Sequence, residues 1–347
     1  MLFVSLGSTS GLRAADEQLC IALRRAGASV EMVGVPAPAQ VRTMMLTDLA
    51  WARSARAAVK RGLAAHAAHP PRSIIYSSTT AALLWPVPGA IRFDAPAAGN
   101  RPGRHGLWQR PLERARLRAA PLLLPWSEGG LREASPRAEQ AARALVLPVA
   151  VEPSGPSAPA PARDVAAITY AANPSKKGLD RVLAAWRALR ERWPPARGEE
   201  LLVAGVEERE LERAGLGGRR GEGVRALGLM ERERYRALLR RARVFVCAPR
   251  REDYGIAQLE ALADGCMLVT TPAPGPYAAL AIARGLDARL VGDDLAGALR
   301  CALEDPLPGY AQRALAALAP YAAQTIERLV GEQLLPRLLG ERAQLGR

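Results

Sequence analysis

The sequence has few of the residues from which disulfide frameworks and metal sites are built. Its four cysteines are scattered without any Cys-x-x-Cys pair, and the whole chain holds only three histidines. This scarcity argues against a disulfide framework and a zinc site. No Asp-x-Asp pair occurs either. The sequence therefore predicts no metal site, and we expect the cysteines to be small buried side chains in a reducing compartment.

Long apolar runs are also missing. No stretch of 18 apolar residues occurs, and Met1 leads directly into the strand-like run Leu2-Phe3-Val4-Ser5-Leu6 without a basic segment before it. A spanning helix needs about 20 apolar residues, and a secretory signal needs a basic start. We expect a cytoplasmic protein, and peripheral contact with the inner face of a membrane stays open.

Aromatic residues make up only 5% of the 347 residues, although 49% are hydrophobic. The apolar surface therefore comes from small and aliphatic side chains, which suit helices packed on parallel strands. The length suits two cores of about 150 to 180 residues each. Strand-like and helical runs alternate along both halves, which predicts an α/β protein with two doubly wound parallel-sheet domains.

Proline marks the expected boundary between the two domains. Four prolines fall between residues 153 and 161, and such density excludes both helix and sheet ladder. The sequence predicts an N-terminal domain over 1–152, a linker over 153–163 and a C-terminal domain over 164–320. We expect a final helix in 321–347 to cross back to the N-terminal domain.

The charge is strongly positive and unevenly spread. The net charge is +14, and 19 Lys/Arg against 10 Asp/Glu in residues 1–160 leave +9 there and +5 in the rest. A basic excess fits a nucleic acid, an anionic membrane or a phosphorylated substrate, and an Arg-rich composition alone also produces it. No recognition motif or aromatic-interleaved basic strand supports nucleic acid. Six arginines gather in one Pro- and Gly-rich stretch and the helix after it: Arg101, Arg104, Arg110, Arg114, Arg116 and Arg118.

Two glutamates and a glycine form the most informative segment. Glu252 and Glu260 are separated by seven residues, and Gly255 lies between them at the start of a predicted helix. The first-turn amides of that helix, at Gly255, Ile256 and Ala257, suit a pyrophosphate. A carboxylate one turn into the helix can accept hydrogen bonds from the two vicinal hydroxyls of a ribose. Each glutamate alone is equally typical of a solvated surface acid.

This segment resembles the E-x7-E signature of retaining glycosyltransferase family 4, and Ser175-Lys176-Lys177-Gly178 is similar to the Lys-Gly phosphate motif of that family. The resemblance covers nearly the whole chain. It implies a GT-B fold, with two Rossmann-like domains facing across a cleft, and a metal-independent, retaining transfer of a hexose from a nucleotide-diphosphate sugar to an acceptor hydroxyl. The donor is expected to be a UDP- or GDP-sugar, and no cofactor is expected.

The resemblance also implies roles for individual residues. Glu252 and Lys177 become the catalytic pair, with Glu252 on the sugar and Lys177 on the diphosphate. The donor would further meet Gly7 and Ser8 in the first turn of the chain, Leu229 beside the base, and Tyr254, Gly255, Ile256 and Glu260 of the signature.

The acceptor side offers two weaker candidates. Asp94 follows a strand-like run and is an ordinary turn former as well, and His105 lies in a loop where a lone histidine is commonly exposed. The acceptor itself, a small molecule, a glycan or a lipid-linked sugar, cannot be read from the sequence.

Two departures from the family keep a second function open. Ala171 stands where many members carry an arginine, so that Arg250, Arg251 or Lys176 would have to compensate, and Tyr277 stands where relatives often carry Gly-Gly and an acid. These departures favour, as the alternative, a non-catalytic GT-B-fold subunit that binds a nucleotide or a partner.

Overall fold

The computed structural model divides the chain into two compact units. The first unit is Met1–Ala150 together with the segment that begins at Pro320, and the second is Val151–Ala319. In the described residues, no helix is long and apolar enough to cross a membrane. The structure describes residues 1–38, 43–101, 103–155, 163–213 and 223–340.

The first unit is built on a parallel sheet of five strands in the order β2-β1-β3-β4-β5. All four residues of β1 are buried, as expected for a parallel strand covered on both faces. The order reverses between β1 and β3, so that the loops after these two strands lie at the switch point of this sheet. The strands are β1 (Leu2–Ser5), β2 (Glu31–Gly34), β3 (Ile74–Tyr76), β4 (Ala90–Phe93) and β5 (Leu123–Pro125).

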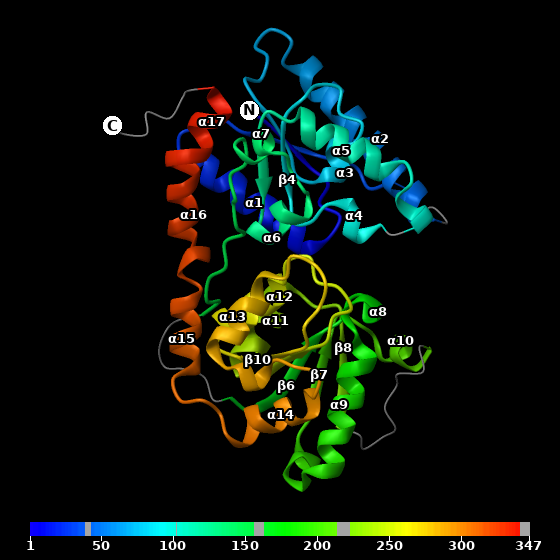
Figure 1. Cartoon of the computed structure of the whole chain (residues 1–347), viewed down its shortest axis with the longest axis vertical. Coiled ribbons are helices and arrows are strands. Elements are labelled where there is room, and N and C mark those ends of the chain that lie inside the picture. Colours follow the sequence, from blue (N-terminus) through cyan, green and yellow to red (C-terminus); the bar gives the residue numbers. More distant parts are fainter. Residues whose placement is uncertain (39–42, 102, 156–162, 214–222, 341–347) are drawn as a thin grey trace. The chain divides into compact units, whose positions relative to one another are not determined.

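Helices cover both faces of this sheet (Figure 1). On one face Leu2 and Val4 pack against a core that includes Val59 and Leu117, and on the other face Phe3 packs against a core that includes Val330. This alternation follows from the period of two along a strand. The first face carries α2 (Met44–Ala65), α3 (Thr79–Ala82) and α5 (Gln109–Ala119), and the second carries α1 (Ser10–Arg25), α16 (Ala323–Leu329) and α17 (Leu335–Leu339).

Shorter elements complete the first unit. They follow β4 and β5 and connect these strands to the helices around them. They are α4 (Ala97–Asn100), η1 (Gly103–Gly106), α6 (Glu128–Glu133) and α7 (Ala138–Ala141).

The second unit has its own parallel five-stranded sheet, in the order β10-β9-β6-β7-β8. The chain proceeds outward from β6 through β7 and β8, and then returns to β9 on the other side of β6. The topological switch point therefore lies between β6 and β9. The strands are β6 (Val165–Tyr170), β7 (Leu201–Ala204), β8 (Val224–Gly228), β9 (Ala242–Cys247) and β10 (Met267–Thr270).

The second unit is doubly wound, because helices alternate with its strands along the chain (Figure 1). The predicted fold class, two Rossmann-like units with parallel sheets, is thereby confirmed. The helices are α8 (Pro174–Lys177), α9 (Leu179–Arg192), α10 (Glu208–Arg213), α11 (Arg232–Arg241), α12 (Ile256–Ala263), α13 (Ala278–Leu286), α14 (Leu295–Glu304) and α15 (Tyr310–Ala317).

Two elements differ from the sequence prediction. The apolar composition of residues 146–151 predicts a strand, but the structure has none there, and the isolated bridge from Ala144 to Leu123 lies before this run. Pro148 has no N–H to donate to a ladder. The final helix expected in 321–347 is interrupted by a π-helical segment at Val330–Leu334. Pro336 follows that segment, and a proline disrupts the regular helical bonding of the preceding turn.

A buried ion pair connects the elements of the first unit. The Arg92 guanidinium in β4 donates to Asp16 of α1 at 2.9 Å, and the Ser5 hydroxyl at the end of β1 donates to the same carboxylate at 2.6 Å. The two charged side chains are 2% and 0% exposed. Burial raises the pKa of Asp16, and the charge of Arg92 opposes that shift. The pair thus fixes the end of β1 against α1, next to the loop that carries Gly7 and Ser8.

Glu113 of α5 makes the stability of the first unit depend on pH. Its carboxylate is buried and accepts the Ala97 amide at 2.8 and 2.9 Å, and burial raises its pKa to about 7. The folded state therefore holds a proton that the unfolded chain releases near its ordinary pKa of about 4.3. The stabilisation is complete below that value and is lost as the pH rises through about 7.

We expect the free energy of unfolding to fall between about pH 4 and about pH 7, with about 1.4 kcal/mol for each unit of pKa difference. Urea unfolding across this range measures it. Glu113→Gln should flatten the dependence, and Glu139→Gln, which removes an exposed carboxylate, should not. An equal slope in wild type and Glu113→Gln would contradict the assignment.

Gly178 joins α8 to α9 in a conformation that only glycine adopts easily. Its φ is +62°, and a Cβ at this position would overlap the carbonyl oxygen of Ala248 after β9. Gly178→Ala should therefore destabilise the protein by about 2 kcal/mol or more. Gly198→Ala is the matched control, because a Cβ there meets no atom within 4 Å. Melting temperatures of the two variants provide the test, and equal values would refute the close approach.

Candidate functional site

An ion pair connects two loops at the switch point of the second unit. Lys177 follows β6 and Glu252 follows β9, and Lys177 Nζ lies 2.7 Å from Glu252 Oε2. Because β6 and β9 are adjacent and parallel, their carboxyl ends meet at one edge of the sheet, where doubly wound folds bind ligands. The structure thus brings together the two residues predicted to form the catalytic pair.

Lys177 is positioned by the short helix α8. The Asn173 side chain caps this helix by accepting the Lys176 amide at 3.1 Å, and Gly178 ends it in the left-handed conformation. The Lys176 carbonyl accepts the Arg250 amide at 3.0 Å, so the loop after β6 is also hydrogen bonded to the loop after β9. The separation of Lys177 and Glu252 is therefore set by backbone contacts as well as by their charges.

The three cations considered as substitutes for the missing arginine are all paired with carboxylates. Lys176 lies 2.7 Å and Arg251 2.8 Å from Asp253, and Arg250 lies 2.8 Å from Asp180. Ala171 is buried at the end of β6. A donor phosphate would have to compete with Asp253 or Asp180 for any of these cations.

Glu252 is nearly buried, with 7% of its side chain exposed. Its carboxylate also accepts the Gln258 Nε2 amide at 3.0 Å, and its backbone amide donates to Pro274 at 3.0 Å. Both hydrogen bonds to the carboxylate end on Oε2. Gln258 was not predicted, and its place six residues after Glu252, on the helix that Gly255 opens, could have suggested it.

Gly255 turns the chain from Glu252 into α12. Its φ is +95°, and a Cβ there would lie 3.0 Å from the Tyr277 ring. Both the backbone conformation and the space available therefore favour glycine. The first-turn amides of α12, which begins at Ile256, have no helical partners and carry the positive end of the helix dipole. Ile256 is half-buried, and the Tyr254 side chain is almost completely buried.

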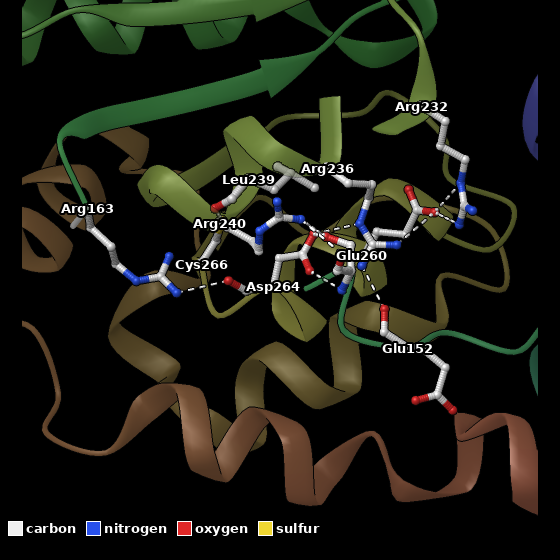
Figure 2. A network of polar contacts seen from close by, with 10 residues as sticks. Glu152, Arg163, Arg232, Arg236, Leu239, Arg240, Glu260, Asp264 and Cys266 are labelled. Atoms are coloured by element: carbon white, nitrogen blue, oxygen red, sulfur yellow. Dashed lines mark hydrogen bonds and ion pairs between the residues drawn. The ribbon is translucent and has the colours of Figure 1, made fainter. Parts of the chain in front are cut away.

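Glu260 is held by two arginines of α11 (Figure 2). Arg232 Nη2 lies 2.5 Å and Arg236 Nη1 3.4 Å from Glu260 Oε1. Arg232 is half exposed, whereas Arg236 is buried. The sequence had suggested that this carboxylate can accept hydrogen bonds from two ribose hydroxyls. That role stays a prediction, and in the structure Oε1 already has two cationic partners.

Arg236 extends the network to the beginning of the second unit (Figure 2). It donates to Asp264 at 2.5 Å and to the Glu152 carbonyl at 2.7 Å. Asp264 also accepts the Ser154 amide at 2.8 Å. Burial would lower the pKa of Arg236, but Asp264 and Glu260 outweigh that effect and raise it. The pairs Arg232/Arg236 and Glu260/Asp264 are each four residues apart, which is one turn on facing helices, and that spacing was the overlooked signal.

Leu229 lies in the connection between β8 and α11 and is 78% exposed. The first residue of α11 is Arg232, so this connection leads directly to the partner of Glu260. An exposed leucine in this connection is consistent with the predicted contact to a base, and that contact stays a prediction.

The other predicted residues belong to the first unit. Gly7, with a φ of +52°, and the exposed Ser8 follow β1 at the switch point of that sheet. Asp94 is half-buried after β4 and accepts the Ala95 amide at 2.7 Å, and His105 is exposed in η1. Their roles toward donor and acceptor stay predictions. Within the described parts of both units, no group of three or more His, Cys, Asp or Glu side chains is placed to hold a metal ion.

The second unit is similar to a known protein family. Residues 164–305 match the model of the family described as glycosyl transferases group 1. No curated protein matches the chain in sequence.

Solved structures match over nearly the whole chain. WaaG, a glycosyltransferase involved in lipopolysaccharide biosynthesis, shares 15% identity over 99% of this chain and 98% of its own, with a TM-score of 0.64. The α,α-trehalose 6-phosphate synthase of Burkholderia multivorans shares 13% over 100% and 99%, with a TM-score of 0.66. HepE of Anabaena, solved with UDP and glucose, shares 16% over 96% and 98%, with a TM-score of 0.64.

Likeness at such low identity shows the fold. The chain therefore has the GT-B fold of these glycosyltransferases, and within it residues 164–305 match the model of the glycosyl transferases group 1 family.

Proposed function

We propose that the protein is a retaining, metal-independent hexosyltransferase that moves a hexose from a UDP-sugar to an acceptor hydroxyl. The observation that carries this proposal is the Lys177–Glu252 pair at the switch point of a group 1 glycosyltransferase domain. The uridine nucleotide is favoured because HepE was solved with UDP and the E. coli trehalose-6-phosphate protein with UDP-2-fluoro glucose. No comparison favours GDP.

The pair suits a site that alternates between an empty and a loaded state. Without a donor, each charge of the pair neutralises the other in a mostly buried place, where an unpaired charge would be costly. A bound diphosphate would take over Lys177, and the Glu252 carboxylate would then be available to the sugar hydroxyls and to positive charge developing at the anomeric carbon. The donor's own phosphate oxygen would accept the acceptor proton on the same face.

Charge on the leaving diphosphate would be met without a metal. Lys177 offers one positive charge, and the first-turn amides of α12 offer the positive end of a helix dipole beside it. Glu260, whose Oε1 is occupied by Arg232 and Arg236, would offer Oε2 to a ribose hydroxyl. We assign the diphosphate to Lys177 and α12, and the ribose to Glu260.

The alternative is a non-catalytic subunit that binds a nucleotide or a partner. It is favoured by the buried Ala171 and by the pairing of Lys176, Arg250 and Arg251 with carboxylates, which leaves fewer cations for a diphosphate. It predicts binding without turnover, whereas a transferase also releases UDP slowly from its donor by hydrolysis.

The first test combines melting temperature with UDP release, using UDP, GDP and their hexose conjugates with EDTA and then with magnesium. We expect UDP and one UDP-hexose to raise the melting temperature without metal. Lys177→Ala and Glu252→Gln should lower turnover by about 10² to 10³-fold, because each removes a charge that acts in the transition state. Lys60→Ala, on an exposed helix surface of the first unit, is the control. Binding without UDP release would favour a nucleotide-binding subunit, and silence across the panel would reject the transferase and favour a subunit that binds a partner.

We also propose peripheral contact with an anionic membrane through a basic face of the first unit. The basic face is the outer surface of α2 and α5, with the exposed residues Arg53, Lys60, Arg61, Arg114 and Arg118. Between Glu31 and Glu128 the sequence has three acids, Asp48, Asp94 and Glu113, and each is buried or half-buried.

Exposed apolar side chains accompany these cations. Met44 and Leu46 at the start of α2, and Leu107 before α5, are 54%, 42% and 63% exposed. Asp48 of α2 bonds to Arg101 and Gln109 on either side of Leu107, which brings the three apolar residues into the same part of the unit. Cations around exposed apolar groups suit a headgroup layer above acyl chains.

Vesicle sedimentation tests the basic face. Binding to phosphatidylglycerol vesicles should exceed binding to phosphatidylcholine and should weaken with salt. Replacing Arg53, Lys60 and Arg114 with Gln should lower affinity by about fivefold for each residue, from about 1 kcal/mol each. Replacing Arg192 and Arg284, which are exposed in the second unit, is the control. Equal losses in both sets, or equal binding to both lipids, would contradict the proposal.

A further inference from the structure

The carboxylate of Glu252 is bonded on one side only. Lys177 Nζ at 2.7 Å and Gln258 Nε2 at 3.0 Å both reach Oε2. No hydrogen bond from the residues that the structure describes reaches Oε1. A carboxylate oxygen can accept about two hydrogen bonds, so Oε2 is filled and Oε1 keeps its full accepting capacity. The two oxygens of the Glu252 carboxylate therefore differ in their hydrogen bonding.

The orientation of the Gln258 amide is fixed by chemistry. The side chain is 1% exposed, and an ionised carboxylate can only accept hydrogen bonds, so the NH2 group must face Glu252. The same nitrogen lies 3.6 Å from Cys247 Sγ. The amide oxygen points the other way and is buried without a hydrogen-bond partner.

This unpaired amide oxygen lowers the free energy of unfolding. A buried carbonyl without a partner costs about 1 to 3 kcal/mol, whereas an apolar side chain of similar size would avoid the cost. Buried polar groups that reduce stability in this way are typical of functional sites. The benefit at this position is the hydrogen bond to Glu252.

Cys247, which Gln258 Nε2 approaches, belongs to a series of buried, hydrogen-bonded side chains. The Cys247 thiol at the end of β9 donates to Thr270 Oγ1 at 3.2 Å, and Thr270 Oγ1 lies 2.9 Å from the Tyr277 hydroxyl. Burial raises the pKa of the Cys247 thiol and of the Tyr277 phenol, so both groups stay neutral. Tyr277, which departs from the family pattern, thus fills the space behind the signature segment and packs on Gly255.

We propose that Gln258 is a positioning residue for the reaction, which holds Oε2 of Glu252 so that Oε1 is presented to the donor sugar. This inference rests on the proposed transferase function. The effect of Gln258 on Glu252 would be greatest when a donor is bound. Lys177 would then contact the diphosphate, and Gln258 would be the remaining hydrogen-bond partner of Glu252 Oε2. The contribution should therefore appear in kcat more than in KM.

The test replaces Gln258 with Met, which keeps the length of the side chain and removes the amide. We expect kcat for UDP release to fall about 10- to 100-fold, with KM and the UDP-induced melting shift nearly unchanged. The pH profile of kcat should change as well, because the variant removes a hydrogen bond to the ionised carboxylate. Gln140→Met, which removes another buried amide in α7 of the first unit, is the control and should change none of these.

A second variant keeps the test informative if Met disturbs the packing. Gln258→Glu preserves the shape, and its carboxyl donates to Glu252 only while protonated, so activity should be low at neutral pH and recover in part as the pH falls. A merely structural role predicts a lower melting temperature for Gln258→Met, whereas we expect none, because the unpaired oxygen is removed as well.

The outcomes separate the two proposals. If wild type turns over a UDP-hexose while Gln258→Met keeps its kcat and pH profile, the positioning role is overturned and the transferase stands. A fall in kcat that only accompanies a loss of melting temperature also overturns it. If wild type neither binds UDP nor releases it, the proposed function fails, and the role of Gln258 fails with it.

Discussion

The ion pair between Lys177 and Glu252 joins two loops that are 75 residues apart in the chain and that follow neighbouring strands of one parallel sheet. Each loop reaches its place by a glycine in a left-handed conformation, Gly178 after Lys177 and Gly255 after Glu252. Neither charge could remain in so enclosed a place alone, since an unpaired buried charge is costly. The pair therefore fixes the loops and, through them, the start of α12.

Near this pair, charged side chains of the second unit form ion pairs with neighbouring side chains of opposite charge. Asp253 takes Lys176 and Arg251, Asp180 takes Arg250, and Glu260 takes Arg232 and Arg236. In the first unit, by contrast, the acids of α2 and α5 are buried while most cations of these two helices are exposed. Residues 1–160 contribute +9 of the net charge of +14, so the excess lies mainly in the first half of the chain, and whole-chain composition could not identify a partner.

Much of the fold follows from the sequence, because apolar runs of strand length alternate with helical periods and are separated by glycine and proline. The spacing of Glu252, Gly255 and Glu260 can be read within one loop and one helix, whereas Lys177 was identified by its resemblance to a family motif. Prediction from the sequence failed where a contact between distant residues, or a proline within an apolar run, determines the structure. Arg232, Arg236 and Gln258 acquire their meaning only from facing side chains, and Pro148 and Pro336 changed elements that their apolar neighbours favoured.

The network of Figure 2 also restricts how this sequence can evolve. Arg236 is buried between Glu260 and Asp264, and it donates to the carbonyl of Glu152 as well. A single replacement of either acid leaves a buried guanidinium partly uncompensated, so most one-step paths through these positions pass an unstable intermediate. In descendants of this chain, Arg236, Glu260 and Asp264 should therefore persist together or be exchanged as a set. Arg232, which is half exposed, can drift on its own and adjust the environment of Glu260 without that constraint.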